Sequence, residues 1–371
     1  MANIKQSVQN ILNLADIKIN GNRSWDIHVK DPKFYSRVLA GGSLALGESY
    51  MDGMWDCDNL DQFFHRILRA DLEKKVKPNA SILLSYFKAK LFNQQSIRKS
   101  KKVVEKHYDL SPDLYMSFLD PYNQYTCGYF KNTKNLNEAQ EKKLDLICKK
   151  LQINKNDKVL DVGCGWGGFA KFASKKYGCH VTGVSISDEQ IKYAKEYCKG
   201  LPVEIIKLDY RNLRGKFDKI LICGMIEHVG SKNYKKIMKK VSNCLNKDGL
   251  FLLHTIGGNE SVKLGEPWIE KYIFPNSMLP SAKQITSASE GLFVMEDWHN
   301  FGKYYDNTLM AWYKNFVKGW DKIKSKYDER FYRMWTYYLL CCAGLFRARK
   351  AQLWQIVFSK NGLKEGYLSV R

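Results

Sequence analysis

Short apolar runs and longer amphipathic stretches alternate through the middle of the chain. The apolar runs, which are typical of buried strands, lie at residues 158–162, 180–186, 203–208, 217–223 and 249–255. The stretches between them repeat their apolar residues every three to four positions, as helices do, at 138–151, 169–177, 188–197 and 234–245. Strands that alternate with helices predict an α/β fold with a doubly wound, mostly parallel sheet. A ligand of such a sheet binds beyond the carboxyl ends of its strands.

The later segments interrupt this alternation and then complete it. Residues 257–290 are an insertion that we expect over the ligand-binding edge. From residue 292 onward the pattern predicts a strand, two aromatic-rich helices and a last strand at 352–358, which makes a seven-stranded sheet. The longest apolar stretch, Met334–Phe346, is shorter than the roughly 20 residues that span a bilayer. Core packing is its simpler interpretation, and a role near a lipid substrate is the other.

A smaller mixed domain precedes the sheet. Residues 1–95 combine helical periodicity at 4–14 and 60–72 with turn signals at Gly41–Ser43 and Asp52–Gly53. We expect residues 1–95 to form a domain of their own.

A basic stretch joins the two parts. Between Arg66 and Lys106, twelve Lys or Arg residues stand against three acidic residues. The stretch is either a solvated helical linker or a patch that rests on anionic lipid headgroups, where each basic residue contributes about 1 kcal/mol. We place the linker at residues 96–106 and expect residues 107–371 to form one domain around the sheet.

The charge and the composition limit the classes of partner that the protein is expected to bind. Sixty Lys and Arg residues against 38 Asp and Glu give a formal net charge of +22, which favours nucleic acid, anionic membrane or acidic metabolites. Aromatic residues make up 13% of the chain, so a partner with both negative charge and apolar surface fits best. The ten cysteines include no CxxC pair, and no metal site or disulfide framework is predicted. The start, MANIKQSVQN, lacks the pattern of a signal peptide, so we expect a cytoplasmic protein.

A glycine-rich loop marks the expected cofactor site. The run Val159–Gly168 is a strand followed by Gly163-x-Gly165-x-Gly167, and glycines allow a tight turn and a close ligand approach. Dinucleotide-binding enzymes use a similar loop. However, the second strand ends in Val184-Ser-Ile-Ser187, without the carboxylate that grips a ribose.

S-adenosylmethionine fits this loop better, because it needs acceptors for its ammonium group and no phosphate cradle. Asp161, inside the first strand, is either such an acceptor or a capped strand-end residue. Gln190 and Asp209 follow the second and third strands. They either meet the ribose and the adenine or are merely solvated or capping.

Further polar groups gather at strand ends, in segments 124–128, 225–230, 253–256 and 300–306. Glu227 and His254 therefore flank the same crevice as the cofactor. Taken alone, each residue could have a purely structural role. Cys127 would be a small core residue, His254 a hydrogen-bonded imidazole in the core, and Tyr305 a packing residue. No Gly-x-Ser-x-Gly elbow occurs, which disfavours a Ser-His-Asp hydrolase.

At these residues the chain resembles the bacterial cyclopropane-fatty-acyl-phospholipid synthases and, more distantly, the mycolic acid cyclopropane synthases. The matching motifs, in chain order, are GGSLALGESYMDGMW (41–55), HYDLSPDLY (107–115), QYTCGYF (124–130), LDVGCGWGG (160–168), IEHVG (226–230), FLLHTIG (251–257), PWIEKYIFPN (267–276), EDWHNFG (296–302) and YDNTLMAWY (305–313). The glycine loop alone is common to many methyltransferases. The later motifs, found in this order, are far more specific.

The resemblance implies a class I S-adenosylmethionine-dependent methyltransferase fold and a cyclopropane-forming reaction. The cis double bond of a phospholipid acyl chain attacks the sulfonium methyl group, a carbocation forms, and a bound bicarbonate takes a proton as the ring closes. The residues implied to hold the bicarbonate are Cys127, Glu227, His254, Ile256 (through its backbone N–H) and Tyr305, although Tyr304 is adjacent to the last. The residues implied for the cofactor are Tyr125, Thr126, Asp161, Gly163, Gly165, Ser185, Gln190, Asp209 and Tyr210.

The resemblance also implies a homodimer that docks, through its N-terminal domain, on the inner surface of an anionic phospholipid bilayer. A nucleic-acid methyltransferase is the first alternative, but no RNA-binding module precedes the sheet and the Asp/Asn-Pro-Pro-Tyr loop is absent. The others are a non-catalytic lipid-binding protein and a small-molecule methyltransferase. We therefore expect a lipid partner and no nucleic acid.

Overall fold

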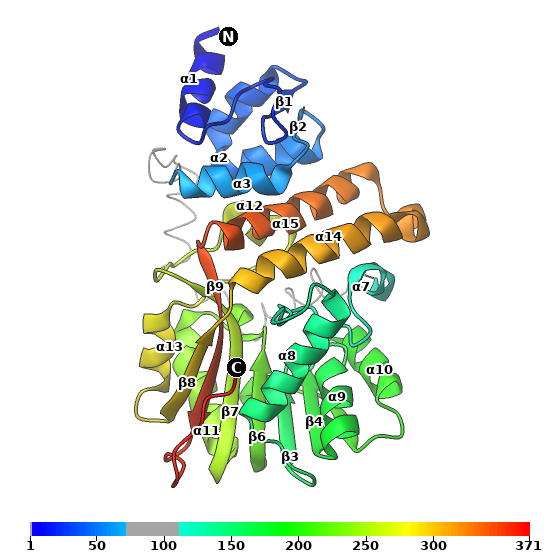
Figure 1. Cartoon of the computed structure of the whole chain (residues 1–371), viewed down its shortest axis with the longest axis vertical. Coiled ribbons are helices and arrows are strands. Elements are labelled where there is room, and N and C mark those ends of the chain that lie inside the picture. The colour runs from blue at the N-terminus through cyan, green and yellow to red at the C-terminus, as the bar shows by residue number, and fades with distance from the viewer. Residues whose placement is uncertain (1, 72–110) are drawn as a thin grey trace. The chain divides into compact units, whose positions relative to one another are not determined.

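The computed structural model describes residues 2–71 and 111–371, and the chain divides into two compact units (Figure 1). The sheet unit comprises Asn93–Val262, Asn276–Tyr304 and Gln352–Arg371, and the helical unit comprises Met1–Phe92, Lys263–Pro275 and Tyr305–Ala351. The helical unit thus takes in two segments from within the predicted domain 107–371. The predicted linker 96–106, with most of the basic stretch from Arg66 to Lys106, lies outside the described residues.

The sheet has seven strands in the order β5-β4-β3-β6-β7-β9-β8. They are β3 (Lys158–Val162), β4 (His180–Ser185), β5 (Val203–Lys207), β6 (Phe217–Cys223), β7 (Leu245–Gly258), β8 (Val294–Asn300) and β9 (Ala351–Ser359). Strands β3 to β7 pair in parallel, and β8 pairs with β9 in antiparallel. The predicted doubly wound, mostly parallel sheet is confirmed. The chief difference is β7, which is longer at both ends than the predicted strand 249–255.

Helices cover both faces of this sheet (Figure 1). They include α8 (Leu136–Lys150), α9 (Gly168–Tyr177), α10 (Asp188–Tyr197), α11 (Tyr234–Cys244) and α13 (Ala282–Ser289), preceded by α7 (Pro112–Phe118). Several begin at a side-chain cap: the Ser187 hydroxyl accepts from the N–H of Gln190, and Ser281 forms a capping box with Gln284. Such caps satisfy N–H groups that the first helical turn leaves without partners.

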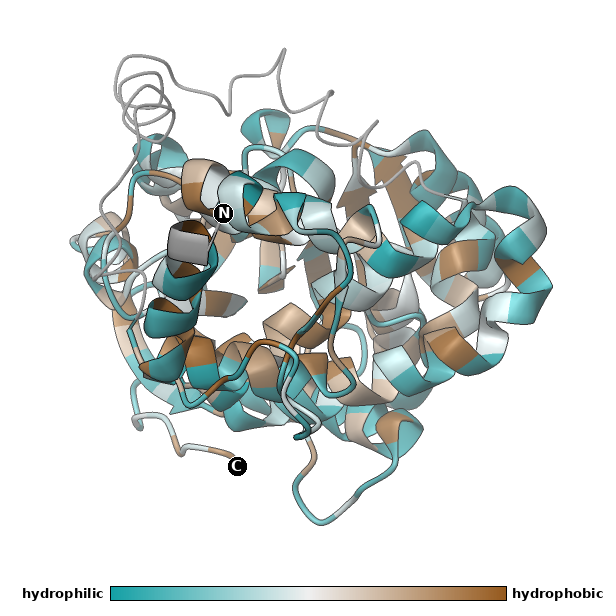
Figure 2. Cartoon of the chain, turned by 90° about the horizontal axis from the view of Figure 1, so that it is seen from above, coloured by the Kyte–Doolittle hydropathy of each residue, from teal (hydrophilic) through white to brown (hydrophobic). Residues whose placement is uncertain are grey.

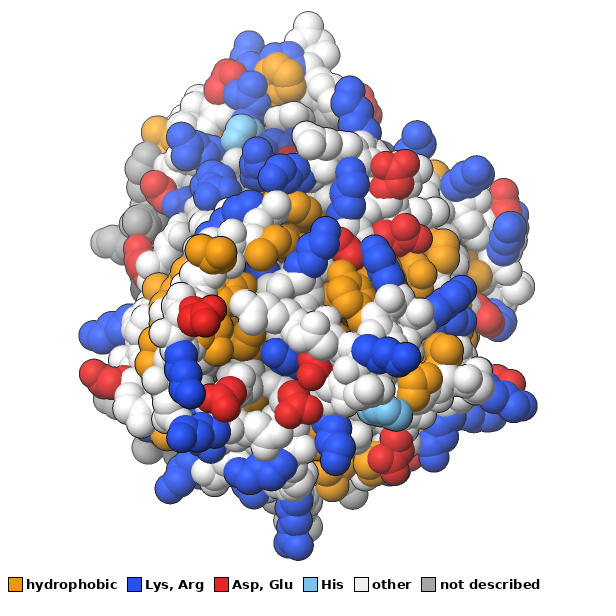
Figure 3. Space-filling model, turned by 60° about the horizontal axis from the view of Figure 1, so that its bottom comes forward, with side chains coloured by type: hydrophobic (Ala, Val, Ile, Leu, Met, Phe, Trp, Pro, Cys, Tyr) orange, Lys and Arg blue, Asp and Glu red, His pale blue; other side chains and the backbone are white. Residues whose placement is uncertain are grey.

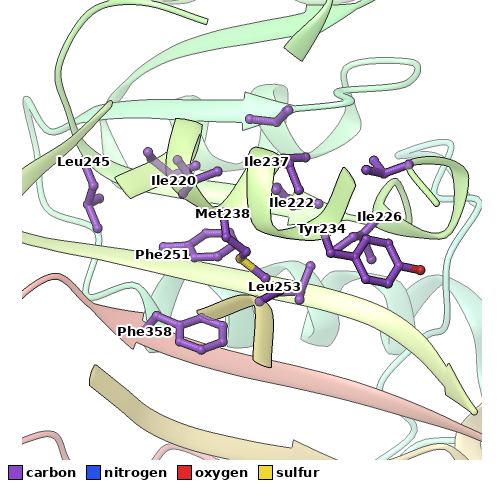
Figure 4. Close-up of a cluster of buried hydrophobic side chains, with 14 of the residues drawn as sticks. Ile220, Ile222, Ile226, Tyr234, Ile237, Met238, Leu245, Phe251, Leu253 and Phe358 are labelled. Atoms are coloured by element: carbon purple, nitrogen blue, oxygen red, sulfur yellow. The ribbon is translucent and has the colours of Figure 1, made fainter. Parts of the chain in front are cut away.

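The core of the sheet unit follows the strand period of two. On β6, Ile220 and Ile222 pack with α11 and α13, whereas Leu221 between them belongs to the opposite cluster under α8 and α9. Figure 4 shows the first cluster, with Met238 of α11 over Phe251 of β7. Because both faces are covered, the central strands contain continuous apolar runs, such as Ile220–Ile222 in β6.

The helical unit is built around aromatic side chains. It contains α1 (Ala2–Asn13), β1 (His28–Val29), α2 (Lys33–Met51), β2 (Trp55–Asp56), α3 (Leu60–Arg69), α12 (Pro267–Tyr272), α14 (Lys303–Ile323, from Tyr305 onward) and α15 (Glu329–Arg347). The rings of Trp268 and Tyr337 lie 4.5 Å apart between centroids. The Arg347 guanidinium of α15 joins three helices of this unit, since it binds Asp61 of α3 at 2.5 Å and Asp306 of α14 at 2.8 Å.

Two sequence predictions for the helical unit have different outcomes. The turn expected at Gly41–Ser43 is instead a kink within α2, where Gly42 has φ +58° and ψ −139°. The turn at Asp52–Gly53 is confirmed, with Asp52 as the C-cap of α2.

The apolar stretch Met334–Phe346 lies in α15 and is largely buried, which favours core packing. Hydrophobic and hydrophilic residues alternate along the helices in Figure 2. Within residues 2–71 and 111–371, no helix is long and apolar enough to cross a membrane.

Candidate active site and cofactor pocket

The glycine loop turns sharply after β3. Gly163, Gly165 and Gly167 all have positive φ, at +86°, +52° and +82°. The N–H groups of Gly163 and Cys164 both donate to the carbonyl of Val184. A Cβ added to Gly165 would meet nothing within 4 Å, so the backbone there faces open space that a ligand can enter.

One pocket opens at the carboxyl ends of β3, β4, β5 and β6. All nine predicted cofactor residues line it: Tyr125, Thr126, Asp161, Gly163, Gly165, Ser185, Gln190, Asp209 and Tyr210. Aromatic rings form part of the wall, with Tyr115 5.3 Å from Tyr125 and 5.6 Å from Trp166 between centroids. The structure therefore brings the predicted set together in a single concave site.

Asp161 is the buried carboxyl group of this pocket. Only 2% of the residue is exposed, and burial raises its pKa to about 7, against the opposing field of Lys143. A buried carboxylate gains most from a cationic partner.

The other polar side chains of the pocket have local partners. Ser185 Oγ donates to Gln190 Oε1 at 3.0 Å. Asp209 caps a short turn, accepting from the N–H of Arg211, and pairs with its guanidinium at 2.7 Å. Asp209 therefore acts as a cap, and this role is compatible with a contact to a ligand.

Helix α8 supplies two pocket-wall anchors that the sequence reasoning missed. Lys143 Nζ donates to Thr126 Oγ1 at 2.9 Å and also to Gln124 Oε1. One turn earlier, Gln140 Nε2 donates to the Thr126 carbonyl at 2.8 Å. The helical period could have predicted that both side chains are buried, because Gln140 and Lys143 share the face of α8 that carries the buried Ile147.

Glu227 and Ile256 are in direct contact. Glu227 lies in the short helix η3 (Ile226–His228) after β6, and its Oε1 accepts the backbone N–H of Ile256 in β7 at 2.8 Å. The Glu227 carbonyl accepts the N–H of Met278 from the insertion at 2.8 Å. Burial raises the pKa of Glu227 to about 6. The N–H predicted to hold the anion therefore holds the Glu227 carboxylate in this structure.

His254 lies in β7 beside Cys223, the last residue of β6. Its Nδ1 is 3.2 Å from Gln355 Nε2 on β9, and its ring meets the edge of Phe301. Burial lowers the pKa of His254 well below its usual value of 6.5, so the imidazole is neutral.

Two buried atoms of this centre lack partners. Within the described part of the chain, neither His254 Nε2 nor Glu227 Oε2 makes a hydrogen bond. Buried polar groups are seldom left without a partner. These two atoms are therefore candidates for contact with a polar ligand, but neither Glu227 nor His254 is among the residues that line the cofactor pocket.

Cys127 and Tyr305 complete the predicted set. Cys127 is buried, with its Sγ 3.3 Å from the carbonyl of Gly128. Tyr305 belongs to the helical unit, where it stacks on Phe346 at 4.4 Å. Its neighbour Tyr304 belongs to the sheet unit and packs against Tyr129. The role of either tyrosine toward an anion stays a prediction.

Known proteins share both this sequence and this fold. A family model described as mycolic acid cyclopropane synthetase matches residues 95–356. The chain is 52% identical over 357 residues to the cyclopropane-fatty-acyl-phospholipid synthase of Escherichia coli strain K12, covering 95% of this chain and 94% of that protein.

Solved structures agree with the sequence relatives. The cyclopropane synthase MmaA2 of Mycobacterium tuberculosis is 27% identical, with a TM-score of 0.66, over 70% of this chain and 98% of that one. The mycolic acid cyclopropane synthase CmaA1, complexed with SAH and CTAB, is 29% identical, with a TM-score of 0.64, over the same shares. The chain thus belongs to the mycolic acid cyclopropane synthetase family of S-adenosylmethionine-dependent methyltransferases.

Proposed function

We propose that this enzyme adds a methylene carbon across the cis double bond of unsaturated phospholipid acyl chains, with S-adenosylmethionine as the donor, to form a cyclopropane ring. The observation that carries this proposal is the 52% identity, over 95% of the chain, to a protein named cyclopropane-fatty-acyl-phospholipid synthase. The pocket at the strand ends and the two unpartnered atoms of Glu227 and His254 support it.

The pocket fits S-adenosylmethionine. The Asp161 carboxylate would accept the ammonium group, the open backbone at Gly165 would admit the ligand, and Gln190 and Asp209 would hold the sugar and the base. When bound, this cofactor supplies a methyl group on a positively charged sulfur. Tyr125, Thr126, Gly163, Ser185 and Tyr210 complete the proposed binding set.

An alkene is a weak nucleophile, so the protein must contribute orientation and a dry site. Tyr115, Tyr125 and Trp166 contribute three aromatic rings to the wall of the pocket. Such rings stabilise positive charge that develops on the acyl chain.

We also propose that bicarbonate binds between Glu227 and His254. With Gln355 Nε2 donating to Nδ1, the neutral imidazole of His254 carries its proton on Nε2 and donates it to an anion. Glu227 Oε2 accepts the hydroxyl of the same ion. The Ile256 N–H fixes the Glu227 carboxylate, and Cys127 and Tyr305 remain proposed members of the site. When bound, bicarbonate supplies a base for the proton that leaves as the ring closes.

The proposed partner is an anionic bilayer. We propose that the protein binds the inner surface of this bilayer as a peripheral protein and that it acts as a homodimer. The formal net charge of +22 favours such a surface. On the face shown in Figure 3, Lys and Arg side chains are spread among acidic and hydrophobic ones.

The test is an incubation of the purified protein with S-adenosylmethionine, bicarbonate and vesicles of unsaturated anionic phospholipid, followed by mass spectrometry of the acyl chains. We expect a gain of one CH₂ with loss of the double bond. A gain that leaves a double bond would mean simple methylation and would refute the ring-closing site. No gain, with cofactor binding established, would direct the search to nucleic acids and small amines.

A further inference from the structure

We infer that Asn123 is a further ligand-binding residue of the cofactor pocket, which donates to the carboxylate of S-adenosylmethionine, and that Tyr193 positions its amide. This inference rests on the proposed use of that cofactor. Asn123 lines the pocket but lies outside the predicted set of ligand-binding residues. Tyr193 belongs to α10 and stands behind it.

Asn123 has an unusual backbone and a fixed side chain. Its φ is +53°, in the left-handed region, and the residue is only 8% exposed. Its Nδ2 donates to the hydroxyl of Tyr193 at 3.0 Å. A primary amide carries two N–H groups. The bond to Tyr193 uses one of them and sets the direction of the amide, so the other can be offered to a ligand.

The chain on both sides of Asn123 is held against the glycine loop. A Cβ added to Gly168, which follows the last glycine of the loop, would lie 1.8 Å from the Tyr122 carbonyl oxygen and 2.4 Å from Gln124 Nε2. The Asp120 side chain closes this turn, because it accepts the N–H groups of Tyr122 and Gln124. The missing side chain of Gly168 therefore lets residues 122–124 approach the loop closely.

Tyr193 is itself held beside the same loop. Its ring lies edge-on to that of Trp166, between the second and third glycines, with 5.4 Å between centroids. One turn along α10, the Tyr197 hydroxyl donates to the Pro121 carbonyl at 2.5 Å. Helix α10 thus fastens the segment before α8 at two points, and it places the amide of Asn123 next to the glycine loop.

The chemistry of the cofactor gives this amide a partner. The proposed acceptor of the ammonium group is Asp161, two residues before the loop, and the carboxylate is bonded to the same carbon as that ammonium group. Among the described residues that line the pocket, Arg211 is the only Lys or Arg, and its guanidinium pairs with Asp209 at 2.7 Å. The carboxylate therefore needs neutral donors beside the loop. Hydrogen bonds to such a charged acceptor are stronger than neutral ones.

The experiment measures the binding of two ligands by calorimetry, on the full chain and on its variants. One ligand is S-adenosylmethionine, and the other is its decarboxylated form, which keeps the ammonium group, sulfur, sugar and base. Asn123→Gly removes the amide and keeps a residue that tolerates the left-handed conformation. For this variant we expect about tenfold weaker binding of S-adenosylmethionine and unchanged binding of the decarboxylated form.

Two further variants use the same contact. Tyr193→Phe keeps the ring against Trp166 and removes only the bond to the amide, so we expect about threefold weaker binding of S-adenosylmethionine alone. Asn123→Asp still accepts a hydrogen bond from Tyr193 but brings a negative charge toward the carboxylate of the ligand. It should bind S-adenosylmethionine more weakly than Asn123→Gly does.

Asn132→Gly and Tyr177→Phe are the matched controls. Asn132 also has a positive φ, at +56°, and the Tyr177 hydroxyl donates to Asp145 at 2.8 Å. Neither residue lines the pocket. Both variants should bind the two ligands as the wild type does, and thermal unfolding reports whether each variant folds.

The outcomes are distinct. Equal losses for both ligands in Asn123→Gly would mean that Asn123 only shapes the turn, and this result, or no loss, overturns the inference. Tighter binding of S-adenosylmethionine by Asn123→Asp would assign the side chain to the ammonium group and overturn it as well. These results leave the proposed function standing. Failure of the wild type to bind S-adenosylmethionine overturns the proposed function itself.

Discussion

The backbone N–H of Ile256 donates a 2.8 Å hydrogen bond to Oε1 of Glu227. This contact ties the helix after β6 to the end of β7 and fixes the direction of the carboxylate. The other oxygen, Oε2, is buried and has no partner in the described part of the chain. The fold therefore satisfies one oxygen of Glu227, and the second oxygen is the one that we propose for the ligand.

Replacing Glu227 with Gln should abolish ring formation and leave S-adenosylmethionine binding nearly intact. The amide keeps its bond with Ile256 but brings an N–H₂ group and no charge toward the proposed bicarbonate. Mass spectrometry of acyl chains measures the first effect and calorimetry the second. Asp161→Asn is the contrasting variant, since it should weaken cofactor binding about tenfold or more. Equal loss of binding and ring formation in Glu227→Gln would show that Glu227 is assigned to the wrong site.

The same substitution should stabilise the protein at neutral pH. Burial raises the pKa of Glu227 from 4.5 to about 6. At pH values between 4.5 and 6, the Glu227 carboxyl group holds its proton in the folded state more than in the unfolded state. The free energy of unfolding therefore falls as the pH rises through this range. The difference of about 1.5 units corresponds to about 2 kcal/mol.

Urea unfolding should therefore show Glu227→Gln more stable by about 2 kcal/mol above pH 6, with the gain fading toward pH 4.5. The quantity to compare is the unfolding free energy of the variant minus that of the wild type. If this difference were smaller at pH 8 than at pH 4.5, the buried, ionisable state of Glu227 would be contradicted.

Gln355→Leu should weaken the response to bicarbonate. Its amide lies 3.2 Å from His254 Nδ1, and we propose that this contact sets the tautomer that presents Nε2–H. Losing one such bond costs about 1 kcal/mol, so we expect about a fivefold higher bicarbonate concentration for half-maximal rate. Gln352→Leu, on the same strand but bonded to Asn259, is the control. Identical bicarbonate curves for Gln355→Leu and wild type would rule out this positioning role.

Gly165→Ala should lower the affinity for S-adenosylmethionine. The added methyl group would enter the open space above the loop, at a φ of +52° that costs an alanine about 1 kcal/mol. Gly200→Ala is the control. It carries a similar backbone cost at φ +80°, and its added methyl group also meets open space, but Gly200 does not line the pocket. Both variants should unfold at similarly lowered temperatures, and only Gly165→Ala should bind the cofactor more weakly. Unchanged binding by Gly165→Ala would place the ligand elsewhere.

Much of the sheet unit could be predicted because its elements are local. The bounds of β3, β6 and α10 agree with the apolar runs and periods read along the chain. Buried parallel strands are continuous apolar runs, and their helices repeat every 3.6 residues. The helical unit was harder, since its chain positions are scattered among residues 263–275 and 305–351 as well as the N-terminal part.

What the sequence determined by itself is the order of strands and helices, the glycine loop and the identity of the polar residues at the strand ends. Each of these depends on residues a few positions apart, where backbone sterics and side-chain periodicity act directly. The tertiary structure decided which of these groups meet. Gln355 reaches His254 across 101 positions of the chain, and Ile256 reaches Glu227 across 29. It also decided that the lysine at position 143 is buried behind the pocket wall instead of solvated. Such contacts depend on how strands and helices pack in space, and no local pattern encodes them.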